Sequence, residues 1–145
     1  MSDDHRRVTL ERLDEGVYLA RNQRGVELRF GSKAEDGFSP VELLLAAIAG
    51  CSALDIDVVT GRRSPAETFG ARVEADVVRD ETGSVLQDIT LTFSVTFPPG
   101  QAGEAARAIL PRAAKASHDR TCTVSRTIEA GVPVTIRVDG LTDNV

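Results

Sequence analysis

Two cysteines stand in this sequence where a thiol could act as a nucleophile. Cys51 lies between a glycine and a serine in the apolar stretch AIAGCSALD, and Cys122 follows about 70 residues later in the stretch TCTVS. A thiolate can attack the O–O bond of a peroxide, so such a cysteine could support peroxidase chemistry. The alternative is packing, because a free thiol behaves as a small apolar group that is usually buried.

Ionisation of Cys51 is the condition for that chemistry. The residue lies well past the first turn of the helix expected around it, so the positive end of the helix dipole hardly reaches its sulfur. Burial in an apolar helix raises the pKa of a thiol. Cys51 is therefore expected to be inert unless an arginine or another cation stabilises its thiolate.

Length and charge limit the classes of protein to consider. The chain has 145 residues, which suits one domain over residues 1–145. There are 17 Lys and Arg against 22 Asp and Glu, a net charge of −5, and the basic residues are scattered. No nucleic-acid partner is expected from this distribution.

Targeting and redox compartment follow from the amino terminus and the cysteine count. The start MSDDHRRV lacks an apolar signal core, and the apolar run from Leu43 to Cys51 is too short to cross a bilayer. We therefore expect a cytoplasmic protein without a membrane partner. In a reducing compartment two cysteines are more often catalytic, redox-sensing or buried than permanently bridged.

A meander and a helix are expected to position Cys51. The runs VTLERL, GVYLARN and VELRF are separated by turn-prone residues and predict three antiparallel strands, with Arg29 on the polar side of the third. Ser39 as N-cap, Pro40 and Glu42 then form a capping box that opens a helix ending near Gly61. This helix is apolar on nearly every side, so it is expected to run through the middle of a larger structure.

The second half of the chain predicts two more strands, a helix and a final strand. FGARVEADVV and DITLTFSVTF alternate apolar and polar residues around the turn DETG. The alanine-rich stretch GQAGEAARAILPRAAKASH predicts a helix with a break or kink at Pro111. VPVTIRV predicts a last alternating strand, and the order of elements indicates an α+β domain.

The long apolar helix also bears on the oligomeric state. Small residues on it allow a second helix to approach closely; they are Ala46, Ala47, Ala49, Gly50 and Ala53. A second copy of the chain packed across a two-fold axis would cover the helix, so a homodimer is expected. The alternative is a monomer in which the second helix alone covers the first.

Three segments together resemble one known family. SPVELLLAAIAGCSALD, CTVSRTIE and LRFG resemble segments of the OsmC/Ohr family (osmotically inducible protein C and organic hydroperoxide resistance protein), in a divergent OsmC-like branch. The resemblance implies an OsmC-like α+β fold with antiparallel sheets, a long central helix and a second helix in an intertwined homodimer. It also implies thiol-dependent reduction of organic hydroperoxides, and of hydrogen peroxide as a further substrate, in oxidative or osmotic stress.

The same resemblance implies roles for individual residues. Cys51 would be the peroxidatic cysteine and Cys122 the resolving cysteine, so that oxidation ends in a disulfide between them. Arg29, contributed by the other chain of the dimer, would stabilise the Cys51 thiolate. No bound cofactor is implied, and the disulfide would be reduced by an external dithiol or a lipoylated protein.

One position departs from the family pattern. Val41 stands where the family has the glutamate that holds the arginine, and Glu42 is rotated from that place by about 100° on a helix of 3.6 residues per turn. Glu42 remains the candidate for this role, although it also belongs to the capping box. Glu27 and Glu35 are the other carboxylates that could replace the missing one.

Other functions find less support in the residues. His118, Asp119 and Cys122 could be combined with Cys51 into a metal site, but only one clustered ligand pair is present, so no metal is expected. With His5 and His118 as the two histidines and no nucleophile elbow, a serine hydrolase is not expected. The remaining alternative is a non-catalytic dimer that binds a small apolar ligand or acts as a stress-linked interaction module.

Overall fold

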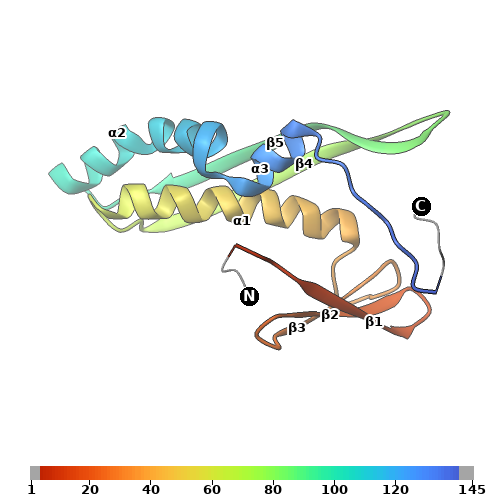
Figure 1. Ribbon diagram of the computed structural model, residues 1–145. Helices are drawn as coiled ribbons and strands as arrows, with labels where there is room; N and C mark the ends of the chain where they lie inside the picture. The colour runs from red at the N-terminus through yellow and green to blue at the C-terminus, as the bar shows by residue number, and fades with distance from the viewer. Residues whose placement is uncertain (1–3, 141–145) are drawn as a thin grey trace. The chain divides into compact units, whose positions relative to one another are not determined.

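The computed structural model describes residues 4–140 and confirms the α+β class. Three strands precede a long helix, a two-stranded hairpin follows it, and three helical segments follow the hairpin (Figure 1). The described residues form two compact units that divide between Ala47 and Ile48, inside the long helix.

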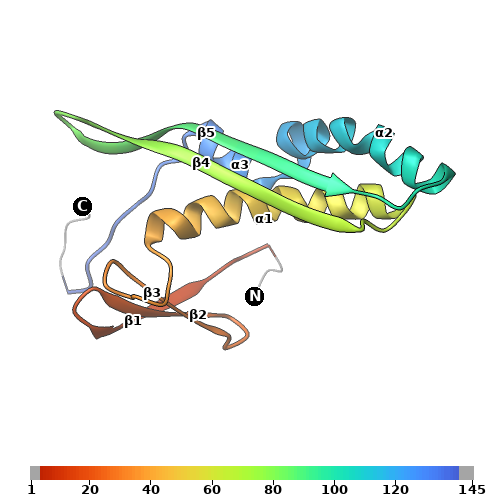
Figure 2. The same ribbon diagram turned by 180° about the vertical axis from the view of Figure 1, so that it is seen from behind.

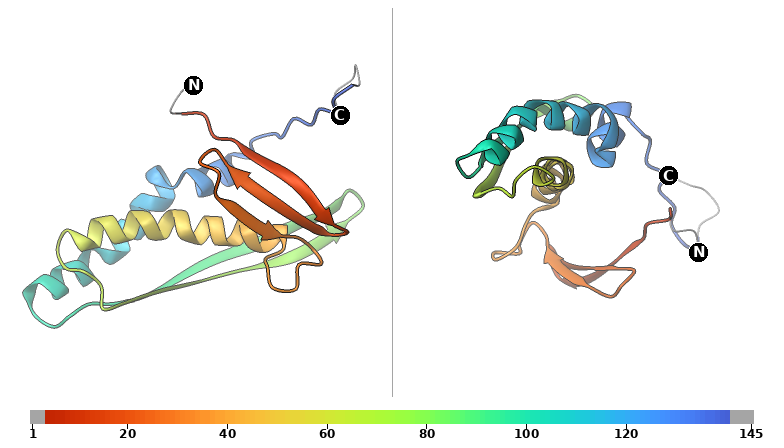
Figure 3. Two further views of the ribbon diagram at one scale, coloured as in Figure 1. Left: turned by 90° about the horizontal axis from the view of Figure 1, so that it is seen from below. Right: turned by 90° about the vertical axis from the view of Figure 1, so that its left-hand side faces the viewer.

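The first unit contains the predicted meander. Strands β1 (Val8–Asp14), β2 (Val17–Asn22) and β3 (Glu27–Phe30) pair antiparallel in the order β1-β2-β3, as the left view of Figure 3 shows. In the register between β2 and β3, Leu19 lies opposite Arg29. The three strands and their order are therefore as predicted from the alternation.

The long helix α1 (Pro40–Gly61) has the bounds that its capping signals predict. The Ser39 backbone N–H donates to Oε1 of Glu42 at 2.9 Å, and the Glu42 N–H donates to Oγ of Ser39 at 3.2 Å. Two backbone donors that lack helical partners are satisfied in this way. The capping box is confirmed, and it fixes the first turn of the helix that carries Cys51.

Burial of α1 is confined to one face. Its buried residues recur every fourth position and are Ile48, Ser52, Ile56 and Thr60. Over an 18-residue window the helix has a mean hydropathy of 1.9, and 22% of that window is buried. By length and hydropathy, the whole helix could cross a membrane, whereas the run from Leu43 to Cys51 alone could not. Core helices of soluble proteins have the same length and hydropathy. In a single chain, large apolar side chains of α1 remain exposed: Val41, Leu44, Leu54 and Val58.

The second unit is built on a long hairpin. Strands β4 (Thr68–Asp80) and β5 (Gly83–Thr96) pair antiparallel, and Figure 2 shows the hairpin in front of α1. The predicted strands are confirmed and extend further towards the turn, where Oδ1 of Asp80 accepts hydrogen bonds from Thr82 and Gly83. The pairing of β4 and β5 contains a bulge, where Asp88 has a φ of 54°. The bulge determines which face of the hairpin the residues after Asp88 occupy.

Helix α2 (Gln101–Ala116) continues through Pro111, so of the predicted break or kink the break does not occur. A proline removes one hydrogen bond of the helical ladder, and the alanine-rich turns on either side have high helix propensity. A π-helical turn, η1 (Ser117–Thr121), follows without interruption. The chain therefore stays helical up to the residue before Cys122.

Two features after η1 differ from prediction. Helix α3 (Thr123–Ala130) was not expected; Cys122 is its N-cap and Gly131 closes it in the left-handed conformation, at a φ of 63°. The strand predicted for VPVTIRV is wrong, because residues 132–138 are irregular and Val134 is 85% exposed. A strand is stable only against a partner, and the described part of this chain provides none for that segment.

Candidate functional site

The second unit brings the two cysteines together. Cys51 is half-buried on α1, and Cys122 is fully buried at the N-cap of α3. Both thiols are free, and each acts on the pKa of the other, so the two side chains lie within interaction range. The helices α1 and α3 thus place two sulfurs next to each other, as formation of a disulfide between them would require.

Ionisation of Cys51 is disfavoured within this unit. Burial raises the pKa of its thiol, and the hydrogen bond to Cys122 and the negative charge of Asp55 raise it further. The backbone N–H of Val124 acts in the opposite direction but does not outweigh them. None of these influences is a cation, so a reactive thiolate at Cys51 requires a positive group from elsewhere.

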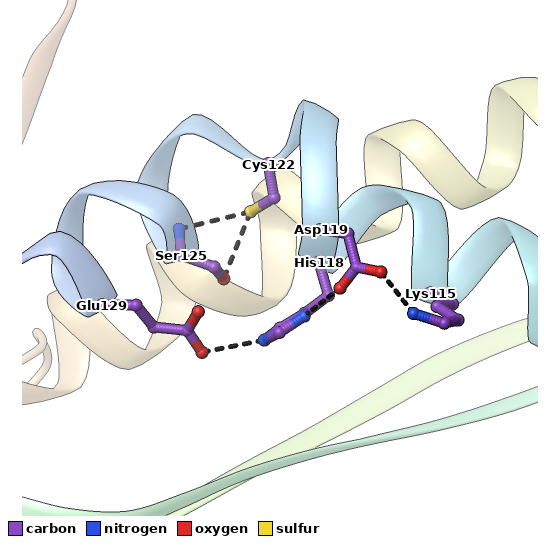
Figure 4. A network of polar contacts seen from close by, with 6 residues as sticks. All are labelled: Lys115, His118, Asp119, Cys122, Ser125 and Glu129. Carbon is purple, nitrogen blue, oxygen red and sulfur yellow. Dashed lines mark hydrogen bonds and ion pairs between the residues drawn. The ribbon is translucent and has the colours of Figure 1, made fainter.

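Cys122 has the opposite tendency. Burial opposes its ionisation, but interactions with the hydroxyls of Ser125 and Ser52, with the Ser125 amide and with the Cys51 thiol outweigh burial and lower its pKa. Its sulfur lies 3.3 Å from Oγ and 3.4 Å from the backbone nitrogen of Ser125 (Figure 4). The arrangement therefore favours a proton on Cys51 and negative charge on Cys122.

Asp55 links α1 to the turn that precedes Cys122. Its Oδ2 accepts hydrogen bonds from Oγ of Ser117 at 2.7 Å and Oγ1 of Thr121 at 2.8 Å. These residues are the first and the last of η1. Asp55 was not among the site residues predicted from the sequence; the available signal was its position one helical turn after Cys51, which puts both on one side of α1.

His118 lies between two carboxylates. Its Nδ1 is 2.8 Å from Asp119 and its Nε2 is 2.8 Å from Glu129, while Lys115 pairs with Asp119 from the other side (Figure 4). Hydrogen bonds to Asp119, and then to Glu129, raise the pKa of the imidazole. Within residues 4–140, no three His, Cys, Asp or Glu side chains are grouped as a metal ion would need. The network joins η1 to α3 across Cys122.

A substitution of His118 tests this network. A histidine whose pKa is raised on folding stabilises the fold fully below its unfolded pKa, and this contribution is lost as the pH rises through the folded value. His118→Gln is therefore expected to lower the free energy of unfolding more at about pH 6 than at about pH 9. Because the side chain is 58% exposed, solvent screens the pairs, and the loss should stay below about 1 kcal/mol. Urea unfolding at both pH values measures the difference; an equal loss at both would contradict the charged pairing.

A pocket of about 300 Å³ adjoins the thiol pair. Ser52 and Ser125, the two hydroxyl partners of Cys122, line it together with His118 and Glu129. The remaining walls come from α1, β5, α2 and α3 and are apolar: Ile48, Ile89, Leu91, Phe93, Ala114 and Ile128. We call this space the serine-lined pocket. It can hold a small apolar group with its polar end towards the two serines.

The other two predicted site residues belong to the first unit. Arg29 projects from β3, and its Nη1 lies 2.6 Å from Oδ1 of Asp36; the side chains are 48% and 82% exposed. Glu42 is engaged with Ser39 in the capping box, and Glu27 pairs with Arg21 at 3.4 Å. The carboxylate beside Arg29 is thus Asp36, which was not among the predicted candidates.

The glycine after Arg29 and Phe30 has a structural reason. Gly31 has a φ of 146°, and a Cβ at this position would lie 2.1 Å from the carbonyl oxygen of Gly16. A side chain here would clash with backbone, so the turn requires glycine. The turn leads into the loop that carries Asp36 back towards Arg29.

Comparisons with known proteins agree with this architecture. A family model described as OsmC-like protein matches residues 32–137. An uncharacterised protein of Mycobacterium tuberculosis is 29% identical over 131 residues, which cover 89% of this chain and 93% of the relative. A hypothetical protein from Aquifex aeolicus superposes with a TM-score of 0.72 at 23% identity, covering 89% of this chain and 90% of the other. The organic hydroperoxide resistance protein OhrB of Bacillus subtilis superposes with a TM-score of 0.51 at 17% identity, and the match covers 85% of this chain and 90% of OhrB.

Proposed function

Since this chain belongs to the OsmC-like protein family, we propose that it is a thiol-dependent peroxidase that reduces organic hydroperoxides. The observation that carries the proposal is the proximity of the Cys51 and Cys122 thiols, each of which acts on the pKa of the other. The name of the Bacillus subtilis relative, an organic hydroperoxide resistance protein, supports the substrate class. The apolar walls of the serine-lined pocket beside the thiols also suit an alkyl substituent.

The proposed reaction uses both sulfurs. The Cys51 thiolate attacks the distal oxygen of the hydroperoxide; the O–O bond breaks, the alkoxide takes up a proton and leaves as the alcohol, and Cys51 becomes a sulfenic acid. The Cys122 sulfur then attacks the Cys51 sulfur, which releases water and forms a disulfide. An external dithiol reduces the disulfide to two thiols and is itself oxidised to a disulfide.

The positive group that Cys51 needs is proposed to be Arg29 of a second copy of the chain. In the single chain Arg29 is held by an ion pair with Asp36 that is exposed on both sides. Exposed ion pairs contribute at most about 1 kcal/mol, so the guanidinium can be redirected to the half-buried thiolate of Cys51 at little cost. The uncovered apolar surface of α1 around Cys51 is where a second copy would pack.

Oxidation with one equivalent of hydroperoxide tests the proposal. Cumene hydroperoxide should convert the free thiols into a Cys51–Cys122 disulfide, read as a loss of two hydrogen masses and as a cross-linked peptide pair after digestion. The alcohol product should appear in equal amount. Free thiols after the peroxide has been added in excess would reject the assignment.

Substitution of Arg29 tests the source of the positive charge. An opposite charge a few ångströms away lowers a pKa by about 1–3 units, so Arg29→Met is expected to reduce kcat/KM for cumene hydroperoxide by about 10- to 1000-fold. Arg29→Lys keeps the positive charge but lacks the planar guanidinium, so its kcat/KM should fall less than that of Arg29→Met. Unchanged kcat/KM in Arg29→Met would show that another group activates Cys51.

The serine-lined pocket favours one alternative, a non-catalytic dimer that binds a small apolar ligand. Its walls are mostly apolar, and neither sulfur lines it. In that case an apolar fluorescent probe should bind with the same affinity to the wild type and to Cys51→Ser, and hydroperoxides should not be consumed. Consumption of hydroperoxide that requires Cys51 would decide for the peroxidase.

A further inference from the structure

Asp55 stands out among the polar groups near the thiol pair because it faces both α1 and η1. It is half-buried, lies on α1 one turn after Cys51, and accepts two hydrogen bonds from the ends of η1. The second of these donors, Thr121, is the residue directly before Cys122. A single carboxylate therefore touches the segment that carries one sulfur and acts electrostatically on the other.

We propose that Asp55 is the positioning residue of the thiol pair: it anchors the π-helical turn beside Cys122 to α1, and its negative charge keeps the shared proton on Cys51. The role rests on the thiol chemistry proposed above and deepens it. It assigns to Asp55 the control of which sulfur is ionised before a second copy of the chain supplies a cation.

The anchoring part follows from the helix geometry. A π-helical turn is rare and frequently occurs at a functional site. Here Ser117 and Thr121 are both fixed to the same carboxylate oxygen of α1, at 2.7 Å and 2.8 Å. Hydrogen bonds to an ionised group are stronger than those between neutral groups, so η1 is held in register with α1. Cys122 follows at once and keeps its place beside Cys51.

The electrostatic part follows from the charges that face Cys51. The groups acting on its thiol are Cys122 from the N-cap of α3, the Val124 amide, and Asp55 on its own helix. A carboxylate near a thiol disfavours the thiolate, so Asp55 opposes ionisation of Cys51, while two serines and a backbone amide favour it at Cys122. Cys51 is therefore kept in its protonated, unreactive form until the cation arrives.

Asp55→Asn tests the charge in a chain that also carries Cys122→Ser, where Cys51 is the remaining thiol. The pKa of Cys51, followed by the ultraviolet absorbance of the thiolate as pH is raised, should fall relative to Cys122→Ser alone. Asp57→Asn in the same background is the matched control, because Asp57 is an exposed carboxylate two positions along α1. It should leave the Cys51 pKa unchanged. An unchanged pKa in Asp55→Asn, or an equal fall in both variants, would overturn the charge role.

Ser117→Ala combined with Thr121→Val tests the anchor while the Asp55 charge stays. With both cysteines present, closure of the Cys51–Cys122 disulfide by diamide should slow by at least about tenfold, because two hydrogen bonds to a charged group are lost. Diamide oxidises thiols without peroxide, so this result is independent of peroxidase activity. An undiminished closure rate would overturn the anchoring role, whereas closure by diamide without consumption of hydroperoxide would reject only the proposed function.

Discussion

Replacing Cys51 with serine is expected to abolish the consumption of cumene hydroperoxide, with a loss of about 10³-fold or more, because removal of a nucleophile leaves only binding and electrostatic effects. Cys122→Ser is expected to behave differently. It should consume one equivalent of hydroperoxide per chain and then stop in the presence of a dithiol that acts only on disulfides. Hydroperoxide consumption is measured with enzyme in excess over hydroperoxide and with hydroperoxide in excess over enzyme. These two assays distinguish loss of all activity from a single turnover.

The contrast between the variants identifies which sulfur reacts first. In Cys122→Ser the sulfenic acid of Cys51 has no partner, so it should be trapped by dimedone and appear as an adduct on the peptide containing Cys51. The lowered pKa of Cys122 makes the reverse order a definite alternative. If Cys51→Ser gave the single turnover and an adduct on Cys122, the roles of the two cysteines would be exchanged.

Features governed by neighbouring residues could be predicted from the sequence. The bounds of α1 follow from Ser39, Pro40 and Glu42 at one end and Gly61 at the other, and both ends were correct. The hairpin of β4 and β5 follows from alternation around a turn that Asp80 closes by itself. In each case the stabilising contacts lie within a few residues or between adjacent strands.

Features that depend on distant contacts could not be predicted in the same way. Helix α3 begins at a cysteine, which is not among the usual N-cap residues, and it is held through His118 and Glu129. Asp55 gains its role from Ser117 and Thr121, more than sixty positions away. The alternating segment 132–138 has the pattern of a strand, but no strand of the described chain pairs with it.

Leu54→Asp is expected to convert a dimer of this chain into a monomer. Leu54 is 71% exposed on α1, three positions after Cys51, and Val58 beyond it is 57% exposed. Burying one leucine contributes about 1.5–3 kcal/mol, so the loss at two copies is about 3–6 kcal/mol, or roughly 10²- to 10⁴-fold in dimer affinity. The charge of the aspartate adds to this loss. Analytical ultracentrifugation measures the dissociation constant.

The control and the activity of the same variant connect the dimer to the chemistry. Leu54→Met conserves volume and apolar character, so it should remain dimeric and active. Because Leu54 is exposed in the single chain, its replacement by aspartate should leave the circular dichroism of the monomer unchanged. Such a folded monomer keeps Cys51, Cys122 and Asp55 but lacks the arginine of a second copy, so hydroperoxide consumption should fall as it does in Arg29→Met. A Leu54→Asp monomer with full peroxidase activity would place the activating cation within one chain.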